Sequence, residues 1–384
     1  MKDISIYFKP LESFTPKSDS IGSSIFVNDE NGFPEIEKKG VAIIHVPEYR
    51  NSATPSRETG FDYDFRDELY GLFPGDNWSF RLYDLGTIVP GENVTDTYFA
   101  LSQVISELVK KQVVPFVVGG GQDLIMSLYK GFEALEQMIN ICTVDDRLDV
   151  GEPSEAITSD GFISHLLMQR PCYLFNYSSL GLQRPFASKQ QVGLFEKLFF
   201  DTIRLGQMNT DIKVVEPYLR NSDVVALDFR SIKQSETDGR VYNSPNGLYA
   251  EQICQIAKYA GLSDKVSCFG IFEVDQSHSL TATKLLAQII WYFIDGVAQR
   301  VSDFPIGSRK NYTKFHVHLD DFEEDLVFYK SDKSARWWLE VKYNSGENSK
   351  YERHTLVPCS QDDYDNALKN VIPNLWWRTL QKLS

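Results

Sequence analysis

The chain lacks the sequence features of several protein classes. Its five cysteines are odd in number and scattered, and no CxxC pair occurs among them, so the sequence predicts reduced thiols rather than a disulfide framework. No apolar run approaches the ~20 residues that span a bilayer. The beginning of the chain has no basic segment followed by a continuous apolar one, which a signal peptide would need. These absences favour a cytoplasmic protein without direct membrane insertion.

Positive charge is also scarce. The chain has 39 Lys and Arg against 53 Asp and Glu, which gives a formal net charge of -14, and no basic stripe offsets it. Such a surface repels the phosphates of nucleic acids and of anionic membranes. We therefore expect no nucleic-acid partner. Hydrophobic residues make up 42% of the chain, which is enough to bury a sizeable core.

Short apolar runs alternate with segments of helical periodicity from about residue 40 to 295. The runs predict buried strands, and the apolar faces between them predict helices at 97–111 and 281–295. Continuous apolar strands that alternate with helices are typical of a parallel sheet covered on both faces. We therefore expect residues 1–305 to form a three-layer α/β/α domain that includes an N-terminal extension. The strands are expected at 41–46, 113–118, 139–144, 172–175, 224–227 and 266–272.

The pattern changes in residues 306–384. The segments 326–329 and 337–343 flank the polar turn SDKS and predict a β-hairpin. Ser360 followed by Asp363 is typical of a capping box and predicts a helix that ends at Pro373. We expect a β-hairpin-plus-helix appendage packed on the main domain. Its tryptophan doublets could be covered by the main domain or could form a surface for a protein partner: Trp337, Trp338, Trp376 and Trp377.

Carboxylates follow three of the predicted strands. Asp145, Asp228 and Glu273 each come one residue after an apolar run, and Asp149 comes four residues after Asp145. Ligand sites of parallel α/β sheets form at the carboxyl ends of the strands, so these acids are expected to converge there. The alternative is that each acid only caps the turn or helix that follows its strand.

Four segments of the chain resemble the signature segments of the arginase superfamily, which includes arginase, agmatinase and formimidoylglutamase. They are GGGQD, VDDRLD, ALDFRS and FEVDQS, in the family's order, and the resemblance covers roughly residues 35 to 300. It implies the arginase fold. It also implies a site where, in the family, two manganese ions activate a water molecule that attacks a linear amidine or guanidine. The formimidoylglutamase branch is the most similar.

Only part of the family's metal site is present. The resemblance implies that three ligands are retained and three are replaced: Asp145, Asp149 and Asp228 stand as in the family, and Gln122, Arg147 and Arg230 stand for two histidines and an aspartate. A guanidinium has only donors and stays protonated, so it cannot ligate a metal. It can instead take the place of a cation between carboxylates. We expect both arginines to point into one metal position, and we expect no bound metal or other cofactor.

One retained ion is the alternative. Gln122, Asp145, Asp149 and Asp228 offer an all-oxygen ligand set, which suits Mn²⁺, Mg²⁺ or Ca²⁺.

Two further residues match family positions. Glu273 matches the residue that binds the amidine or guanidine end of the substrate, and it could pair with Arg147 or Arg230 here. His165 lies near the position of a histidine that assists proton transfer in arginases, although an ordinary helix or loop histidine is equally consistent with its segment.

Three functions remain open at this stage. The favoured one is a non-hydrolytic pseudoenzyme that acts as a binding or scaffold protein, with a protein partner or as a homo-oligomer. The alternative is a formimidoylglutamase- or agmatinase-like hydrolase of linear amidines with altered or single-metal chemistry. The second alternative is a sensor of a small anion, in which Arg147 and Arg230 bind the ligand in the old active-site cleft.

Overall fold

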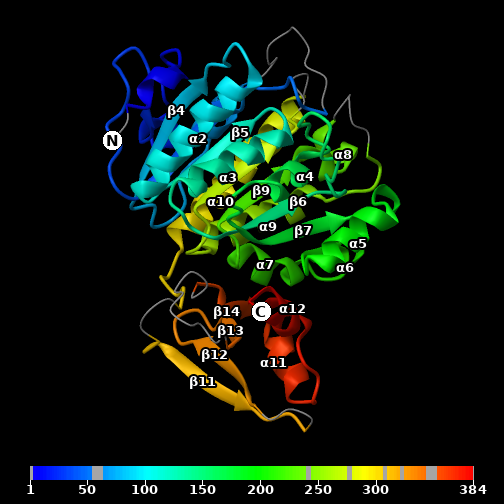
Figure 1. Ribbon diagram of the computed structural model, residues 1–384. Coiled ribbons are helices and arrows are strands. Elements are labelled where there is room, and N and C mark those ends of the chain that lie inside the picture. Colours follow the sequence, from blue (N-terminus) through cyan, green and yellow to red (C-terminus); the bar gives the residue numbers. More distant parts are fainter. Residues whose placement is uncertain are drawn as a thin grey trace.

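The computed structural model describes residues 3–53, 64–238, 244–274, 279–305, 309–320, 324–342 and 353–383. A large layered part is followed by a smaller carboxyl-terminal part beneath it (Figure 1). The strands of the large part are β1 (Phe8–Lys9), β2 (Phe26–Val27), β3 (Gly40–Val46), β4 (Arg81–Ile88), β5 (Val113–Gly119), β6 (Ile139–Val144), β7 (Leu174–Leu182), β8 (Asp201–Arg204), β9 (Val224–Asp228) and β10 (Cys268–Phe272).

These strands form one sheet in the order β1-β4-β3-β5-β10-β9-β6-β7-β8, with β2 beside β4. Every described pair is parallel except β1 with β4. The expected mainly parallel sheet is therefore confirmed. The prediction for 172–175 was wrong in extent, because β7 begins at Leu174 and continues to Leu182 through polar residues. The strands β4 and β8 were not predicted.

Helices cover both faces of the sheet. The helices α1, α9 and α10 pack on one face, and α2 to α5 pack on the other. Alternate residues of each strand point to opposite faces of the sheet. In β3, Val41 and Ile43 belong to the hydrophobic cluster on the face covered by α9 and α10, and Ala42 and Ile44 belong to the cluster on the other face. The helices are α1 (Phe65–Gly71), α2 (Val94–Lys110), α3 (Ile125–Glu133), α4 (Phe162–Leu167), α5 (Lys189–Lys197), α6 (Leu205–Thr210), α7 (Glu216–Arg220), α8 (Gln234–Thr237), α9 (Ala250–Leu262) and α10 (Leu280–Ala298).

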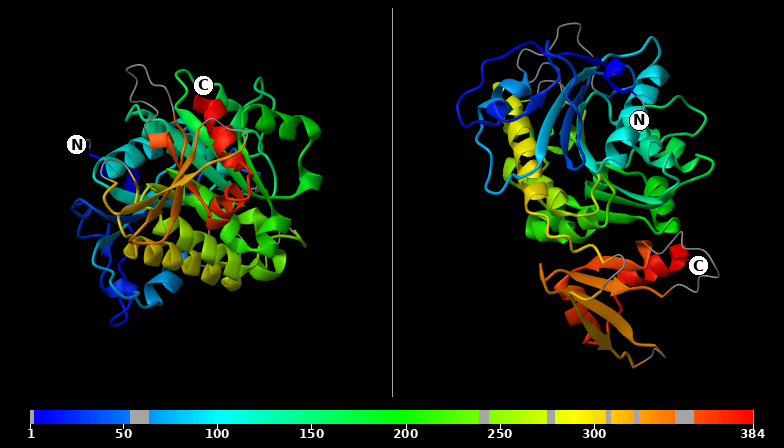
Figure 2. Two further views of the ribbon diagram at one scale, coloured as in Figure 1. Left: turned by 90° about the horizontal axis from the view of Figure 1, so that it is seen from below. Right: turned by 90° about the vertical axis from the view of Figure 1, so that its left-hand side faces the viewer.

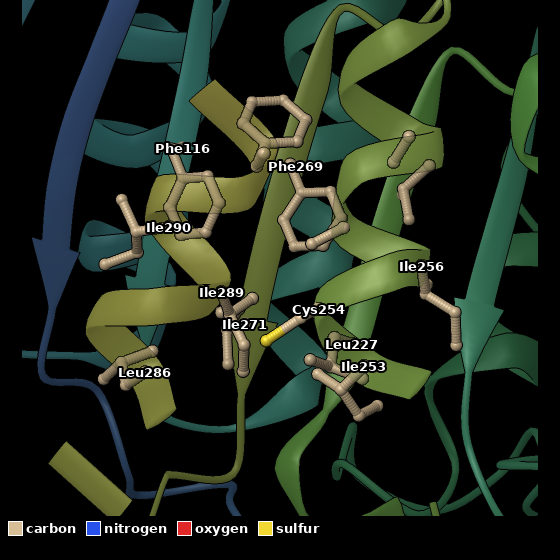
Figure 3. Packing of buried hydrophobic residues seen from close by; sticks show 14 of the residues in the cluster. Phe116, Leu227, Ile253, Cys254, Ile256, Phe269, Ile271, Leu286, Ile289 and Ile290 are labelled. Atoms are coloured by element: carbon tan, nitrogen blue, oxygen red, sulfur yellow. The ribbon is translucent and has the colours of Figure 1, made fainter. Parts of the chain in front are cut away.

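The packing of α9 and α10 on the sheet follows from their apolar stripes. Ile289 of α10 lies against Ile271 in the central strand β10, and Ile253 of α9 lies beside Leu227 of β9 (Figure 3). All four side chains are buried. Fully burying an aliphatic side chain contributes roughly 1.5–3 kcal/mol. This contact, repeated along both helices, fixes one layer of the three-layer arrangement that the sequence predicted. No helix among the described residues is long and apolar enough to cross a membrane.

The carboxyl-terminal part is a second, antiparallel sheet with two helices (Figure 2). Its elements are β11 (Tyr312–Val317), β12 (Leu326–Ser331), β13 (Trp337–Glu340), β14 (Leu356–Cys359), α11 (Gln361–Ala367) and α12 (Asn374–Leu383). The predicted hairpin is the pair β12 and β13, and Tyr343, its predicted end, lies outside the described residues. The Ser360 side chain accepts from the Asp363 amide and begins α11, as its capping pattern predicted.

The side chains of the first tryptophan doublet are buried. Trp337 and Trp338 are 6% and 0% exposed, so of the two alternatives for this doublet the structure has packing within the chain. Both faces of the small sheet are covered within the chain. The ring of Trp337 stacks on Tyr364 of α11 at 4.6 Å, and the guanidinium of Arg220 in the main domain lies 4.4 Å from the Trp338 ring centroid. Trp376 is half-buried and Trp377 is 48% exposed.

Candidate functional site

Four neighbouring strands at the centre of the sheet bring the predicted residues together. Gln122 follows β5, Glu273 follows β10, Asp228 ends β9 and Asp145 follows β6, and these strands lie in the order β5-β10-β9-β6. Asp149 reaches the same edge from the loop after β6. All five side chains belong to buried residues. The convergence expected for the carboxyl edge of a parallel sheet is what the structure has.

Gln122 connects three of these strands. Its amide Nε2 donates to Asp145 Oδ2 at 2.9 Å, and its backbone N donates to Glu273 Oε1 at 3.0 Å. Its Oε1 is buried and has no hydrogen-bond partner in the described structure. Gln122 therefore donates to the cluster and keeps one buried acceptor oxygen, Oε1, that no hydrogen bond uses.

The glycines before Gln122 allow the backbone there to pass close to the backbone of Glu48. A Cβ on Gly120 would lie 1.9 Å from the carbonyl oxygen of Glu48. That carbonyl also accepts a hydrogen bond from the backbone N of Gly121 at 2.9 Å. The GGG run therefore lets two backbone segments touch beside the site, and a larger residue at Gly120 would force them apart.

Arg230 places its charge inside the cluster. Its Nε donates to Asp228 Oδ2 at 2.8 Å, its Nη2 lies 2.6 Å from the same oxygen, and its backbone N donates to Asp228 Oδ1 at 2.7 Å. Its Nη1 donates to Asp160 Oδ1 at 2.8 Å. Burial disfavours the charge, but Asp228 and then Glu273 raise the pKa of Arg230 above its ordinary value. The Arg230 side chain therefore lies inside the cluster, where we expected it, and its replacement of a metal charge stays a prediction.

Arg147 behaves differently. Its Nε donates to Asp146 Oδ1 at 2.9 Å, its guanidinium lies 5.6 Å from the Phe186 ring centroid, and its side chain is 30% exposed. Only its backbone N reaches the cluster, where it donates to Asp145 Oδ1 at 3.1 Å. The expectation that both arginines point into one metal position was therefore wrong for Arg147. The Arg147 side chain pairs instead with the adjacent Asp146, which is itself buried.

The carboxylates outnumber the buried cation. Burial raises the pKa of Asp149 well above its ordinary value, and the nearby Asp145 raises it further. Burial also raises the pKa of Asp228, and Arg230 opposes this rise. One oxygen of Asp149 is buried and lacks a hydrogen-bond partner in the described structure. The site thus holds more carboxyl groups than the Arg230 charge alone can compensate, and the raised pKa values follow from this and from burial.

Glu273 is held by groups that sequence reasoning did not identify. Ser52 Oγ donates to its Oε2 at 2.7 Å, and its backbone has a φ of 57°, which is strained for a residue other than glycine. Asp160 and Asp146 were missed as well. Ser52 and Asp160 come from loops far away in the sequence, where no pattern marks them.

His165 is not part of the cluster. It is a half-buried residue of α4, and its carbonyl accepts a hydrogen bond from Gln169 Nε2 at 2.9 Å. Across the described ranges, no hydrogen bond or ion pair joins its side chain to the five buried site residues. The interpretation of His165 as an ordinary helix histidine therefore accounts for its position.

The residues do not fit two metal ions. Asp228 directs both oxygens at Arg230, and within the described parts of the chain no group of three or more His, Cys, Asp or Glu is arranged to hold a metal. A single divalent ion fits better with the donor chemistry, because Gln122 Oε1 and Asp149 Oδ1 are buried acceptors without partners. Gln122, Asp145 and Asp149 are the residues that would hold such an ion.

The chain is similar in sequence to formimidoylglutamases. It is 24% identical over 241 residues to the enzyme of Clostridium tetani, which covers 57% of this chain and 70% of the relative. It is 23% identical over 261 residues to the enzyme of Bacillus subtilis, which covers 62% and 80%. No family model matches the chain.

Solved structures show the same fold. The formimidoylglutamase of Bacillus subtilis superposes with a TM-score of 0.65 at 18% identity, over 78% of this chain and 98% of that one. The Trypanosoma cruzi formiminoglutamase, determined with two Mn²⁺ ions, gives 0.61 at 17% identity over 68% and 94%. The agmatine ureohydrolase of Thermoplasma volcanium gives 0.56 at 15% identity over 75% and 95%. The resemblance to the arginase superfamily and the arginase-like fold are thereby confirmed.

Proposed function

We propose that this chain is a formimidoylglutamase-like protein that has kept the fold of a C–N hydrolase but not its two-metal chemistry, and that it works as a binding or scaffold protein. The observation that carries this proposal is the ion pair between Arg230 and Asp228, with Nη2 at 2.6 Å from Oδ2. The side chains are 2% and 0% exposed. The guanidinium belongs to the chain itself and occupies the lone pairs of Asp228 that a metal ion would need.

Removal of the metal pair removes the nucleophile of the family reaction. Two cations lower the pKa of a bridging water so that hydroxide forms at neutral pH. In this chain Gln122 donates to Asp145 and Arg230 donates to Asp228, so two of the three retained aspartates already have protein partners. The site is therefore better suited to holding its own strands together than to activating water.

The hydrolase is the second candidate, and the comparisons favour it over the first. The sequence relatives are formimidoylglutamases, and the Trypanosoma cruzi structure contains two Mn²⁺ ions. In this chain one divalent ion would polarise a substrate or water oxygen, and Gln122, Asp145 and Asp149 would hold it. Glu273 would bind the amidine end of the substrate, with its carboxylate oriented by Ser52.

The anion sensor is supported less well. It needs guanidinium groups that are available to a ligand, but Arg230 is engaged by Asp228 and Asp160, and Arg147 is engaged by Asp146. A ligand anion at this edge would also meet Asp145, Asp149 and Glu273, which repel it.

The test combines metal content with turnover. The purified full chain is equilibrated with Mn²⁺, freed of unbound metal and measured by elemental analysis. It is then assayed for formamide, ammonia and urea release from formimidoylglutamate, agmatine and arginine. Substoichiometric manganese without release supports the binding protein. One bound ion with release supports the single-metal hydrolase, and two bound ions contradict both candidates.

A further inference from the structure

A cavity of about 630 Å³ lies between the main domain and the carboxyl-terminal part. On the main-domain side it is lined by Asn176 at the beginning of β7 and Asp201 at the beginning of β8. Parallel strands begin at the opposite edge of the sheet from where they end, so this cavity is distant from the Arg230 cluster. On the other side it is closed by β14 and α12. Its volume is in the range of small-molecule sites.

Two cations on α12 face this cavity. Arg378 and Lys382 are one helical turn apart, and both line the cavity wall. Arg378 Nη1 donates to Asp201 Oδ1 at 3.1 Å, and Lys382 Nζ donates to Asn176 Oδ1. Burial lowers the pKa of Lys382 to about 8, while the Asp201 charge opposes this decrease and the Arg378 charge adds to it. Like charges at this spacing destabilise a helix unless something between them compensates.

Asp201 compensates part of this positive charge through its ion pair with Arg378. Asp201 also accepts hydrogen bonds from Asn176 Nδ2 at 2.9 Å and from Ser178 Oγ at 3.3 Å, so its carboxylate is shared by three donor side chains. An ammonium has three N–H donors, and the bond to Asn176 uses one of them. An anionic oxygen in the cavity could accept from the others.

We propose that this cavity binds a small organic anion, a carboxylate or a phosphate ester with an apolar body, whose charged end is bound by Lys382 and Arg378. The apolar body lies against side chains that already form a hydrophobic wall. These are Phe175, Tyr218, Val357 and Leu375, and the Phe175 ring is stacked on His354 at 3.9 Å.

His354 is a further polar residue in the wall of the cavity. It is 2% exposed, and neither ring nitrogen makes a hydrogen bond of good geometry within the described structure. Burial lowers its pKa well below the ordinary value, and the Lys265 charge adds to this effect. A neutral imidazole can donate from one nitrogen, so His354 offers a further contact for an acceptor of the ligand without adding charge.

Four acidic residues also line the cavity, and the one in contact with its cations, Asp201, is paired with Arg378. Asp362 is exposed at the rim, where water and salt screen its charge. Asp363 is engaged as the capping partner of Ser360, whose N and Oγ donate to its Oδ2 at 2.8 and 2.7 Å. Asp211 accepts from the Lys213 backbone N at 2.9 Å at the opposite rim.

The experiment uses the full chain and three probes of matched shape: benzoate, phenyl phosphate and the neutral benzamide. Binding is measured by calorimetry and by the shift in melting temperature. We expect at least one anion to bind at millimolar concentration and to raise the melting temperature, with weaker binding of benzamide. Hydrogen exchange should slow in α12 and in the first residues of β7 when the anion is bound.

Two variants locate the binding. Lys382→Met removes the buried ammonium and should weaken anion binding about tenfold or more, the effect expected for a charge-assisted hydrogen bond. Lys369→Met removes an exposed charge that does not line the cavity and should leave binding unchanged. The proposal is overturned if neither anion binds, if benzamide binds equally well, or if the two variants behave alike.

Discussion

Arg220 donates from Nη1 to the carbonyl oxygen of Trp337, 2.9 Å away, and thereby ties the main domain to the small sheet. Its Nη2 donates to Cys359 O at 3.1 Å, and its Nε donates to Glu216 Oε1 at 2.8 Å. Arg220 is 3% exposed. One buried guanidinium thus bonds a helix of the main domain to two strands of the appendage.

Replacement of this residue should loosen the appendage. Arg220→Met leaves two buried carbonyls without donors and removes one partner from Glu216, so we expect a loss of about 3–5 kcal/mol in the free energy of unfolding. Hydrogen exchange of β13 and β14 should accelerate more than that of β5. Arg81→Met, which removes an exposed ion pair with Glu37, is the control and should change stability by less than about 1 kcal/mol. Equal effects of the two variants would show that Arg220 is not the anchor.

The buried cluster should depend on Arg230 far more than on Arg147. Arg230→Met leaves Asp228 buried without its cation and should cost about 3–5 kcal/mol in denaturant unfolding at neutral pH. Arg147→Met removes an ion pair whose guanidinium is 30% exposed, so its effect should stay near 1 kcal/mol or below. A larger effect at Arg147 would place the functional cation there and not at Arg230.

Restoration of the family ligands should create a metal site. The triple variant combines Gln122→His, Arg147→His and Arg230→Asp, which exchange donors of the cluster for acceptors. We expect Mn²⁺ to raise the melting temperature of this variant in proportion to the logarithm of the Mn²⁺ concentration. Elemental analysis gives the number of ions. The matched control is Gln122→His, Arg147→His with Arg230 retained, which should bind at most one ion. No manganese effect on the triple variant would mean that the ligands do not share one site.

The pH dependence of stability should reveal Lys265. It is 3% exposed, and burial lowers its pKa to about 8 in the folded chain, while Asp223 opposes this decrease and Arg353 contributes to it. Between pH 8 and about 10 the unfolded state binds more protons at this residue, so its contribution makes stability rise with pH, by on the order of 3 kcal/mol when complete. Lys265→Met should flatten this rise relative to the wild type, as measured by urea unfolding at several pH values. Lys258→Met, which alters a half-exposed lysine, should leave the slope unchanged.

The second tryptophan doublet allows a direct comparison with the first. Trp337→Ala opens a cavity against Tyr364 and should cost about 3–5 kcal/mol. Trp377→Ala alters a side chain that is 48% exposed and should cost much less, about 1 kcal/mol or below. If Trp377 serves a partner, its loss should weaken capture of that partner while the melting temperature stays nearly constant.

Much of the sheet could be predicted because its central strands are apolar on both faces. The strands β3, β5 and β9 are buried along their whole length and consist mainly of apolar residues, and such runs are visible without a structure. The strand β4 was missed because Asp84 stands in its middle. That aspartate is buried and is held by Arg66, with Nε at 2.8 Å from Oδ2, so its charge is compensated by a helix that periodicity alone could not place beside it.

The site was predicted in its residues but not in all its directions. A residue at or just after the end of a parallel strand has its backbone at the carboxyl edge of the sheet. This fixed the backbone positions of Asp145, Asp228 and Glu273. A long side chain can still point in several directions from a fixed backbone position. Arg147 turned to Asp146, its neighbour in sequence, and the partner of Arg230 beyond Asp228 is Asp160, from a loop whose approach depends on the whole fold.

The Arg230 guanidinium is joined to the same backbone as the acid it neutralises, with only one residue between them. A tethered charge cannot be extracted by a chelator or lost when manganese is scarce. It also does not compete with other divalent ions for the site. Asp228 therefore needs no metal for its compensation, and EDTA should leave the melting temperature of the protein unchanged.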